Sequence, residues 1–243
     1  MSAPLVVIPA FNEAQNLPDV LRELATLSYP IILVDDGSSD ETSQVAAHLD
    51  VEVLRLSVNQ GVGAALRAGF RFAVDRGYSS VVQVDADGQH PVHQIADLVS
   101  AAEKTKAHLV IGSRYRSPEA TLQPSFIRRL PMRVMSLLVS RAAGTEITDA
   151  TSGFRIVCEP LLSEFAREFP TYFLGDTYEV TLAAARSGYQ VTEIPAALNN
   201  RKHGESRTTV VNAVVLTFKA LFTTIFRLHP GVRPIRPENP HTQ

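Results

Sequence analysis

The chain has 243 residues, of which 45% are hydrophobic, enough for the buried core of one large α/β domain. Its formal net charge is −2, so no overall positive field draws it to nucleic acid or to anionic lipid. The single cysteine, Cys158, excludes an internal disulfide framework and is interpreted as a small buried hydrophobic residue.

Short apolar segments alternate with helical patterns over the first half of the chain. Met1 leads directly into the first of them with no basic stretch, so we expect no signal peptide and a cytoplasmic protein. Strands are predicted at Leu5–Ala10, Ile31–Asp36, Val51–Leu56, Val81–Asp87 and His108–Arg114. Helices are predicted between them, at Asn16–Thr26, Asp40–Leu49, Gly63–Arg76 and Pro91–Thr105. This alternation predicts an α/β fold with a mostly parallel open sheet and helices on both faces.

Polar residues cluster where the predicted strands end. The first, second, fourth and fifth strands run into "PAFNE", "VDDGSSD", "DADGQ" and "GSRYR". Ligands of such sheets bind outside the carboxyl ends of the strands. Turn and helix-cap roles explain Ser38 and Ser39, but they do not explain Glu13 and Asp36 together with the later aspartate pair. Acid-lined loops favour groups that donate hydrogen bonds, so the predicted ligand is a nucleotide diphosphate.

Asp85 and Asp87 follow an apolar strand and are separated by one small residue. In an extended chain, side chains two residues apart point to the same side, so both carboxylates face one point. A hard cation, Mg²⁺ or Mn²⁺, relieves their repulsion, and Gln89 adds a carbonyl oxygen. The alternative is an ordinary surface turn, where Asp and Gly are favoured by backbone geometry alone.

Seven motifs occur in a fixed order between Leu5 and about Arg207: "VVIPAFNEAQNL", "ILVDDGSSDET", "NQGVGAALRAGF", "VVQVDADGQHP", "IGSRY", "DATSGFR" and "RKHGESR". Together they resemble family 2 glycosyltransferases of the GT-A fold, most of all the polyprenyl-phosphate (dolichyl-phosphate) mannosyl- and glucosyltransferase branch. The resemblance implies a single Rossmann-like GT-A domain, residues 1–228, and transfer of a sugar from a nucleotide-activated donor with inversion.

The resemblance also implies roles for individual residues. The nucleotide would be held by Pro9, Phe11, Glu13 and Asp36, with Asp85 and Ala86 beside the donor, and the metal would be bound by Asp85, Asp87 and Gln89. Arginines suit bidentate contacts to the phosphate oxygens, and the candidates are Arg114, Arg128 or Arg129, and Arg201. For Arg128, and for Arg129 and Arg133 beside it, the alternative is a solvated helix face. The catalytic candidates are Asp87, Asp176 and Arg201.

The acceptor decides whether a general base is needed. A hydroxyl loses a proton as it attacks, whereas a phosphate monoester, with a second pKa of about 6, is mostly ionised at neutral pH. Relatives with hydroxyl acceptors carry a Glu-Asp pair before the acceptor-side helix, and here Gly175 stands in place of that Glu, before Asp176. Asp176 is therefore a general base or a helix N-cap with Glu179 as its capping-box partner, and the two roles can coexist.

The segment 208–228 is long and mostly apolar but is interrupted by Asn212 and Lys219. A central lysine costs about 2.5–3.5 kcal/mol in a spanning helix, so an amphipathic C-terminal helix in peripheral contact with the membrane is favoured. A second contact is expected around Pro124–Arg141, and residues 229–243 are expected to be a disordered tail.

The sequence thus predicts a metal-dependent enzyme at the cytoplasmic face of the membrane. It would move a hexose from a UDP- or GDP-sugar to a polyprenyl phosphate and would bind no nucleic acid. One alternative keeps the donor site but uses a soluble hydroxyl acceptor. Another is a module that binds a nucleotide sugar without turnover.

Overall fold

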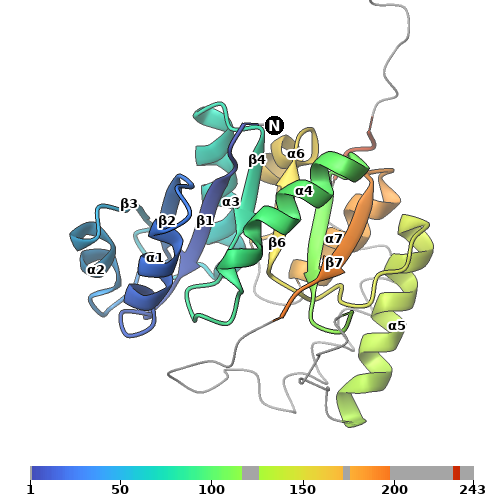
Figure 1. Cartoon of the computed structure of the whole chain (residues 1–243), viewed down its shortest axis with the longest axis horizontal. Coiled ribbons are helices and arrows are strands. Elements are labelled where there is room, and N and C mark those ends of the chain that lie inside the picture. The colour runs from blue at the N-terminus through green and yellow to red at the C-terminus, as the bar shows by residue number, and fades with distance from the viewer. Residues whose placement is uncertain (1, 117–125, 172–175, 198–231, 236–243) are drawn as a thin grey trace, which may run out of the picture.

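The structure, a computed structural model, describes residues 2–116, 126–171, 176–197 and 232–235, without the side chains of 126–131 and 176. In this part of the chain one sheet has the strand order β3-β2-β1-β4-β6-β5-β7 (Figure 1). The strands are β1 Leu5–Ala10, β2 Ile31–Asp35, β3 Glu52–Arg55, β4 Ser80–Gln83, β5 Leu109–Ser113, β6 Arg155–Cys158 and β7 Val191–Pro195.

Helices connect these strands. They are α1 Leu17–Ala25, α2 Thr42–His48, α3 Val62–Asp75, α4 Ile95–Thr105, α5 Phe126–Ala143, α6 Leu161–Glu168 and α7 Asp176–Arg186, with a short 3-10 helix, Val92–Gln94, before α4. The predicted mostly parallel sheet is confirmed, because only β6 runs antiparallel, to both of its neighbours β4 and β5.

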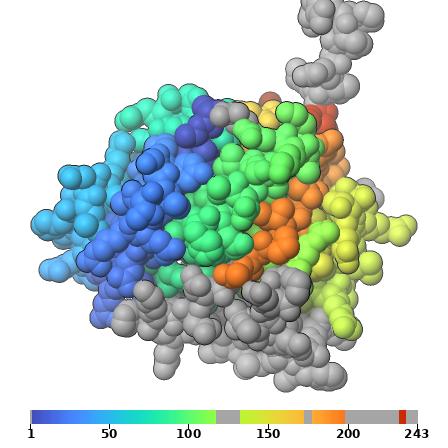
Figure 2. Space-filling model, in the orientation of Figure 1, coloured from blue at the N-terminus to red at the C-terminus, as the bar shows by residue number. Residues whose placement is uncertain are grey.

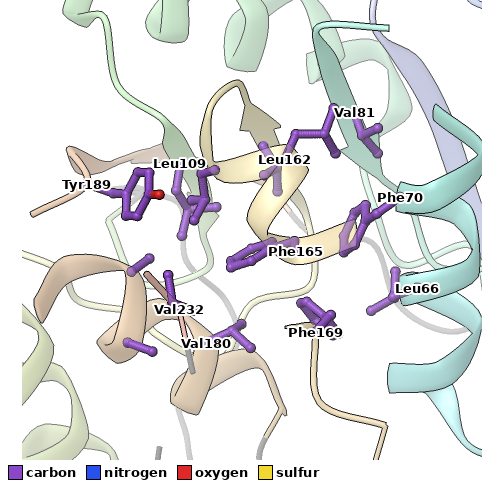
Figure 3. Close-up of a cluster of buried hydrophobic side chains, with 14 of the residues drawn as sticks. Leu66, Phe70, Val81, Leu109, Leu162, Phe165, Phe169, Val180, Tyr189 and Val232 are labelled. Carbon is purple, nitrogen blue, oxygen red and sulfur yellow. The ribbon is translucent and has the colours of Figure 1, made fainter. Parts of the chain in front are cut away.

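The sheet is buried on both faces. Residues of α1, α2 and α4 form one apolar cluster with it, and residues of α3, α5, α6 and α7 form the other. Figure 2 shows the first face, with α1 in blue beside α4 in green. On the second face the ring of Phe70 lies 5.9 Å from that of Phe165 and 5.2 Å from that of Phe169 (Figure 3). The predicted helices on both faces are therefore confirmed.

The fourth strand is shorter than predicted. The Val84 N–H still donates to the Val7 carbonyl, at 3.1 Å, but the Asp85 N–H donates to His90 Nδ1 and not to a neighbouring strand. The ladder therefore stops at Gln83, and both aspartates lie in the loop that follows. Asp87 lies in a turn, so the alternation of an extended strand does not set its direction.

Residues 232–235 belong to the segment expected to be a disordered tail. Here they pack on the domain: Val232 is buried, and the Ser187 hydroxyl donates to its carbonyl at 3.0 Å. The Ile235 N–H donates to the Ser187 carbonyl at 3.0 Å. The Arg233 N–H also donates, to Glu164 Oε2 at 3.2 Å. These four residues therefore contact the domain, and the rest of the predicted tail lies outside the described residues. The predicted helix 208–228 lies outside the described residues.

Among the helices that the structure describes, none is long and apolar enough to span a membrane.

Candidate functional site

The parallel strands deliver their loops to one edge of the sheet, at the lower side of Figure 1. Pro9 is buried within β1, and Phe11 and Glu13, both half-buried, follow in the loop after that strand. Asp36 follows β2, the Asp85–Asp87 loop follows β4, and Arg114 follows β5. The predicted convergence of acidic and basic residues at the carboxyl edge is therefore observed in the described part of the chain.

The loops after β1 and β2 are bound to each other by hydrogen bonds. The Asn12 N–H donates to Ser38 Oγ at 3.0 Å, and Asn12 Oδ1 accepts the Ser39 N–H at 2.8 Å. The Glu13 N–H donates to Thr42 Oγ1 at 3.0 Å. Asn12 takes the left-handed conformation, φ 56°, which asparagine tolerates better than most residues. These bonds fix the backbone on which Phe11 and Glu13 are carried.

Asp35, the last residue of β2, and Asp36, the next residue, are both buried. Asp36 Oδ1 accepts the Gln60 N–H at 2.8 Å and Oδ2 accepts the Gly61 N–H at 2.7 Å, so this carboxylate holds the loop that leads into α3. Burial alone would raise the pKa of Asp35, but hydrogen bonds from Ser38 and Ser43 and the charge of Arg55 outweigh it, so the pKa is lowered. Asp35 is thus ionised and stabilises the turn.

The Asp85–Asp87 loop presents carboxylate oxygens to solvent. The Asp85 side chain is 40% exposed, and Gln83 Nε2 donates to its Oδ1 at 3.3 Å. Asp87 Oδ1 accepts the Gln89 N–H at 3.0 Å, across Gly88 with φ 76°. A Cβ on Gly153 would lie 3.1 Å from Asp85 Oδ2, so only glycine leaves ordinary van der Waals space beside this carboxylate.

The residues of this loop suit a hard cation. No cluster of three or more histidine, cysteine, aspartate or glutamate side chains is arranged for a metal among the described residues. Two carboxylates and the amide oxygen of Gln89 are nevertheless the donor types that Mg²⁺ and Mn²⁺ take, with waters and substrate phosphates filling the other positions. The donor set therefore fits such an ion with a diphosphate ligand.

Arg114 is paired within the protein. Its Nε and Nη2 donate to the two oxygens of Asp149 at 2.6 and 2.8 Å, and Nη2 also donates to Thr151 Oγ1 at 2.7 Å. Burial alone would lower the pKa of Arg114, but the hydrogen bonds and charge of Asp149, with the charges of Tyr115 and Asp85, raise it. Arg114 is therefore a permanently charged group in a fixed position near Asp85.

Two buried residues that the sequence analysis missed support the site. Glu193 in β7 accepts the N–H groups of Thr148 and Asp149 at 2.8 and 3.2 Å, and so holds the partner of Arg114. His90 contacts Asp85. A charged residue within the apolar strand sequence "VTEIP" was the available signal for Glu193.

Three predicted site residues are not placed by the structure. The side chains of Arg128, within α5, and Asp176, the first residue of α7, are outside the described set. Arg201 lies outside the described residues altogether.

The chain is similar to known proteins over most of its length. A family model described as "Glycosyl transferase family 2" matches residues 5–165. The polyprenol monophosphomannose synthase of Mycolicibacterium smegmatis is 34% identical, and the match covers 88% of this chain and 84% of that protein. The undecaprenyl-phosphate mannosyltransferase of Micrococcus luteus is 33% identical over 84% of this chain and 86% of its own.

A similar solved structure is the glucosyl-3-phosphoglycerate synthase of Mycobacterium tuberculosis in complex with Mn²⁺, UDP and glucosyl-3-phosphoglycerate. The TM-score is 0.65 with 18% sequence identity, and the match covers 93% of this chain and 79% of that one. This likeness shows that the two chains share the GT-A fold.

Proposed function

Because the chain belongs to glycosyltransferase family 2 and is a glycosyltransferase, we propose that it moves a hexose from a UDP- or GDP-sugar to a polyprenyl phosphate, with inversion. The observation that carries the proposal is the extent of the similarity. The matches to two relatives named for mannosyl transfer to polyprenyl phosphate cover 88% and 84% of this chain. They extend further than the family model, which matches residues 5–165. The likeness therefore extends through α7, the acceptor-side helix of our proposal.

The donor nucleotide would lie on the loops after β1 and β2. Phe11 and Glu13 are carried by a backbone that Asn12 holds to Ser38, and they would contact the base and ribose. Each carboxylate oxygen of Asp36 accepts one backbone N–H and has capacity for a second donor, such as a base amine. Ala86 and Pro9 would supply close backbone contacts.

The diphosphate would lie over the loop after β4. Asp85, Asp87 and Gln89 would hold Mg²⁺ or Mn²⁺, which when bound neutralises charge on the departing nucleoside diphosphate. The guanidinium of Arg114, held by Asp149, adds a fixed positive charge beside this loop. We propose Arg128 and Arg201 as further contacts to phosphate oxygens.

The acceptor phosphate would need no general base, because it is already ionised at neutral pH. It needs positive charge and correct placement, since two anionic groups must approach each other. Asp176 would then cap α7, and it becomes the candidate base only if the acceptor is a hydroxyl. The lipid part of the acceptor places the reaction at a membrane, at the cytoplasmic face in our proposal.

The test is release of nucleoside diphosphate from a panel of UDP- and GDP-sugars, with Mn²⁺ or Mg²⁺, with and without a short polyprenyl phosphate. We expect release from one donor class, only when both the metal and the lipid phosphate are present. Donor binding without lipid-dependent release would contradict the proposed acceptor and favour a soluble hydroxyl acceptor. Binding with no release to any acceptor would favour a module without turnover.

A further inference from the structure

The side chain of His90 contacts Asp85 at two points. The Asp85 N–H donates to His90 Nδ1 at 2.9 Å, and His90 Nε2 lies 3.4 Å from Asp85 Oδ2. Because Nδ1 accepts a hydrogen bond, the neutral ring carries its proton on Nε2. The imidazole therefore accepts the backbone N–H of Asp85, and its other nitrogen lies against the carboxylate of the same residue.

The two residues differ sharply in exposure. The His90 side chain is 4% exposed and its ring lies 5.3 Å from that of Phe154, whereas the Asp85 side chain is 40% exposed. Gln83 approaches the other carboxylate oxygen, Oδ1, from the end of β4. The carboxylate thus opens to solvent on one side and is held from the protein interior on the other.

We propose that His90 is a positioning residue for Asp85: by accepting the Asp85 N–H it holds this residue where the cation and the donor diphosphate require it. The inference rests on the proposed function, because it assigns Asp85 to that site. Residues behind a metal ligand fix its position by their hydrogen bonds, and loss of such a partner typically lowers metal affinity about 10- to 100-fold. A ring that only fills the core beside Phe154 would leave metal affinity unchanged.

Three substitutions separate the two contacts. His90→Phe keeps the ring and removes both nitrogens. His90→Asn keeps an acceptor near the position of Nδ1, and His90→Gln keeps a donor near the position of Nε2. The matched control is His108→Phe, at a residue that directly precedes β5 and lies away from the site. His108 Nδ1 also accepts a backbone N–H, from Gln190 at 3.0 Å, and the His108 ring contacts that of Tyr189.

The measurement is the dissociation constant of Mn²⁺ in the presence of UDP and, separately, GDP, by electron paramagnetic resonance. We expect His90→Phe to weaken Mn²⁺ binding about 10- to 100-fold, and His90→Asn and His90→Gln to weaken it less. His108→Phe should bind Mn²⁺ as the unsubstituted protein does. In kinetics, KM for the polyprenyl phosphate should stay constant while kcat/KM for the donor falls.

The results distinguish failure of the proposed function from failure of the inference about His90. If the unsubstituted protein binds no Mn²⁺ with either nucleotide, the proposed metal-dependent function fails, and this inference fails with it. If it binds Mn²⁺ and the folded His90 variants bind equally well, the proposed function stands and the inference is overturned. Should His90→Phe not fold, the Asn and Gln variants decide by the same comparison.

Discussion

The aspartates at the carboxyl edge of the sheet differ in what their oxygens contact. Asp35 and Asp36 are buried and accept backbone N–H groups of the loops around them, so their main role is to stabilise these loops. Asp85 and Asp87 are partly exposed and follow the end of β4. Because they keep oxygens accessible to solvent, they are the residues at which charge can be tested with little effect on the fold.

Asp87→Asn should abolish metal-dependent turnover and leave the fold intact. The substituted amide oxygen can still accept the Gln89 N–H that Asp87 Oδ1 now accepts at 3.0 Å, so the turn is kept. The carboxylate charge is lost, and removing a metal contribution of several kcal/mol lowers kcat/KM about 100-fold or more. The measurement is nucleoside diphosphate release against Mn²⁺ concentration, with thermal unfolding as the check on folding.

The control for this substitution is Glu52→Gln, which removes an exposed carboxylate that pairs with Arg76 and lies at the start of β3, away from the carboxyl edge. An exposed ion pair is worth about 0–1 kcal/mol, so neither activity nor stability should change much. Undiminished turnover in Asp87→Asn would rule out the proposed metal site.

Among the helices, α3 links the loop held by Asp36 to the end of α6. Its first turn touches the loop after α6 so closely that a Cβ on Gly63 would lie 2.1 Å from the Pro170 carbonyl oxygen. Arg67 and Arg71 of the same helix donate to backbone carbonyls at the end of α6. The position of α3 therefore fixes the end of α6 and the Pro170–Thr171 segment that follows it.

Gly63→Ala should lower both stability and activity. The added methyl meets a backbone atom, so the Pro170–Thr171 segment must move, at a cost of about 1–3 kcal/mol in the free energy of unfolding. The chain continues from this segment into α7, the acceptor-side helix of our proposal. We expect KM for the polyprenyl phosphate to rise, measured by steady-state kinetics beside urea unfolding.

Gly69→Ala is the matched control within the same helix. Its Cβ would lie 2.4 Å from Val7 Cγ1, a side-chain atom in the core under β1, and no loop would have to move. A similar loss of stability with an unchanged KM is expected. If both variants changed KM equally, the effect would come from general loosening and not from the Pro170 contact.

Across the whole molecule, the sequence predicted those features that depend on residues close together in the chain. Strands β1 to β5 and helices α1 to α4 each have an apolar pattern of their own, and strand ends located Asp36, Asp85 and Asp87. The place of β6 between β4 and β5 depends on pairing of Cys158 with Ser80 and of Val157 with Leu109, which no short pattern encodes.

The supporting residues were missed for a related reason. Glu193 acts on Thr148, 45 positions away in the sequence, so its role appears only when β7 lies beside β5. His90 is close to Asp85 in sequence, but its two contacts depend on the tautomer and on burial against Phe154. Contacts of this kind follow from tertiary packing and not from residue type.

The exposed face of α5 bears on the membrane contact that we propose. In α5, Leu137 is 67% exposed, and Arg133 and Arg141 are exposed one turn to either side, while Met135 and Val139 are buried. Figure 1 shows α5 at the outer edge of the molecule. We propose that this face lies in the membrane interface, with Leu137 inserted and the two arginines at the lipid headgroups.

Leu137→Ser should therefore weaken binding to vesicles of phosphatidylcholine, phosphatidylglycerol and polyprenyl phosphate. Burying a leucine is worth about 1.5–3 kcal/mol, so the partition coefficient measured by co-sedimentation should fall about tenfold or more. The control is Leu49→Ser, a 38% exposed leucine just after α2 and before β3, at the opposite edge of the sheet, which should partition as the unsubstituted protein does. If Leu137→Ser sedimented with the vesicles as much as the unsubstituted protein does, α5 would not be part of the membrane contact. Among residues 132–143, Leu137 is the only large apolar side chain that is exposed, so its loss should be felt.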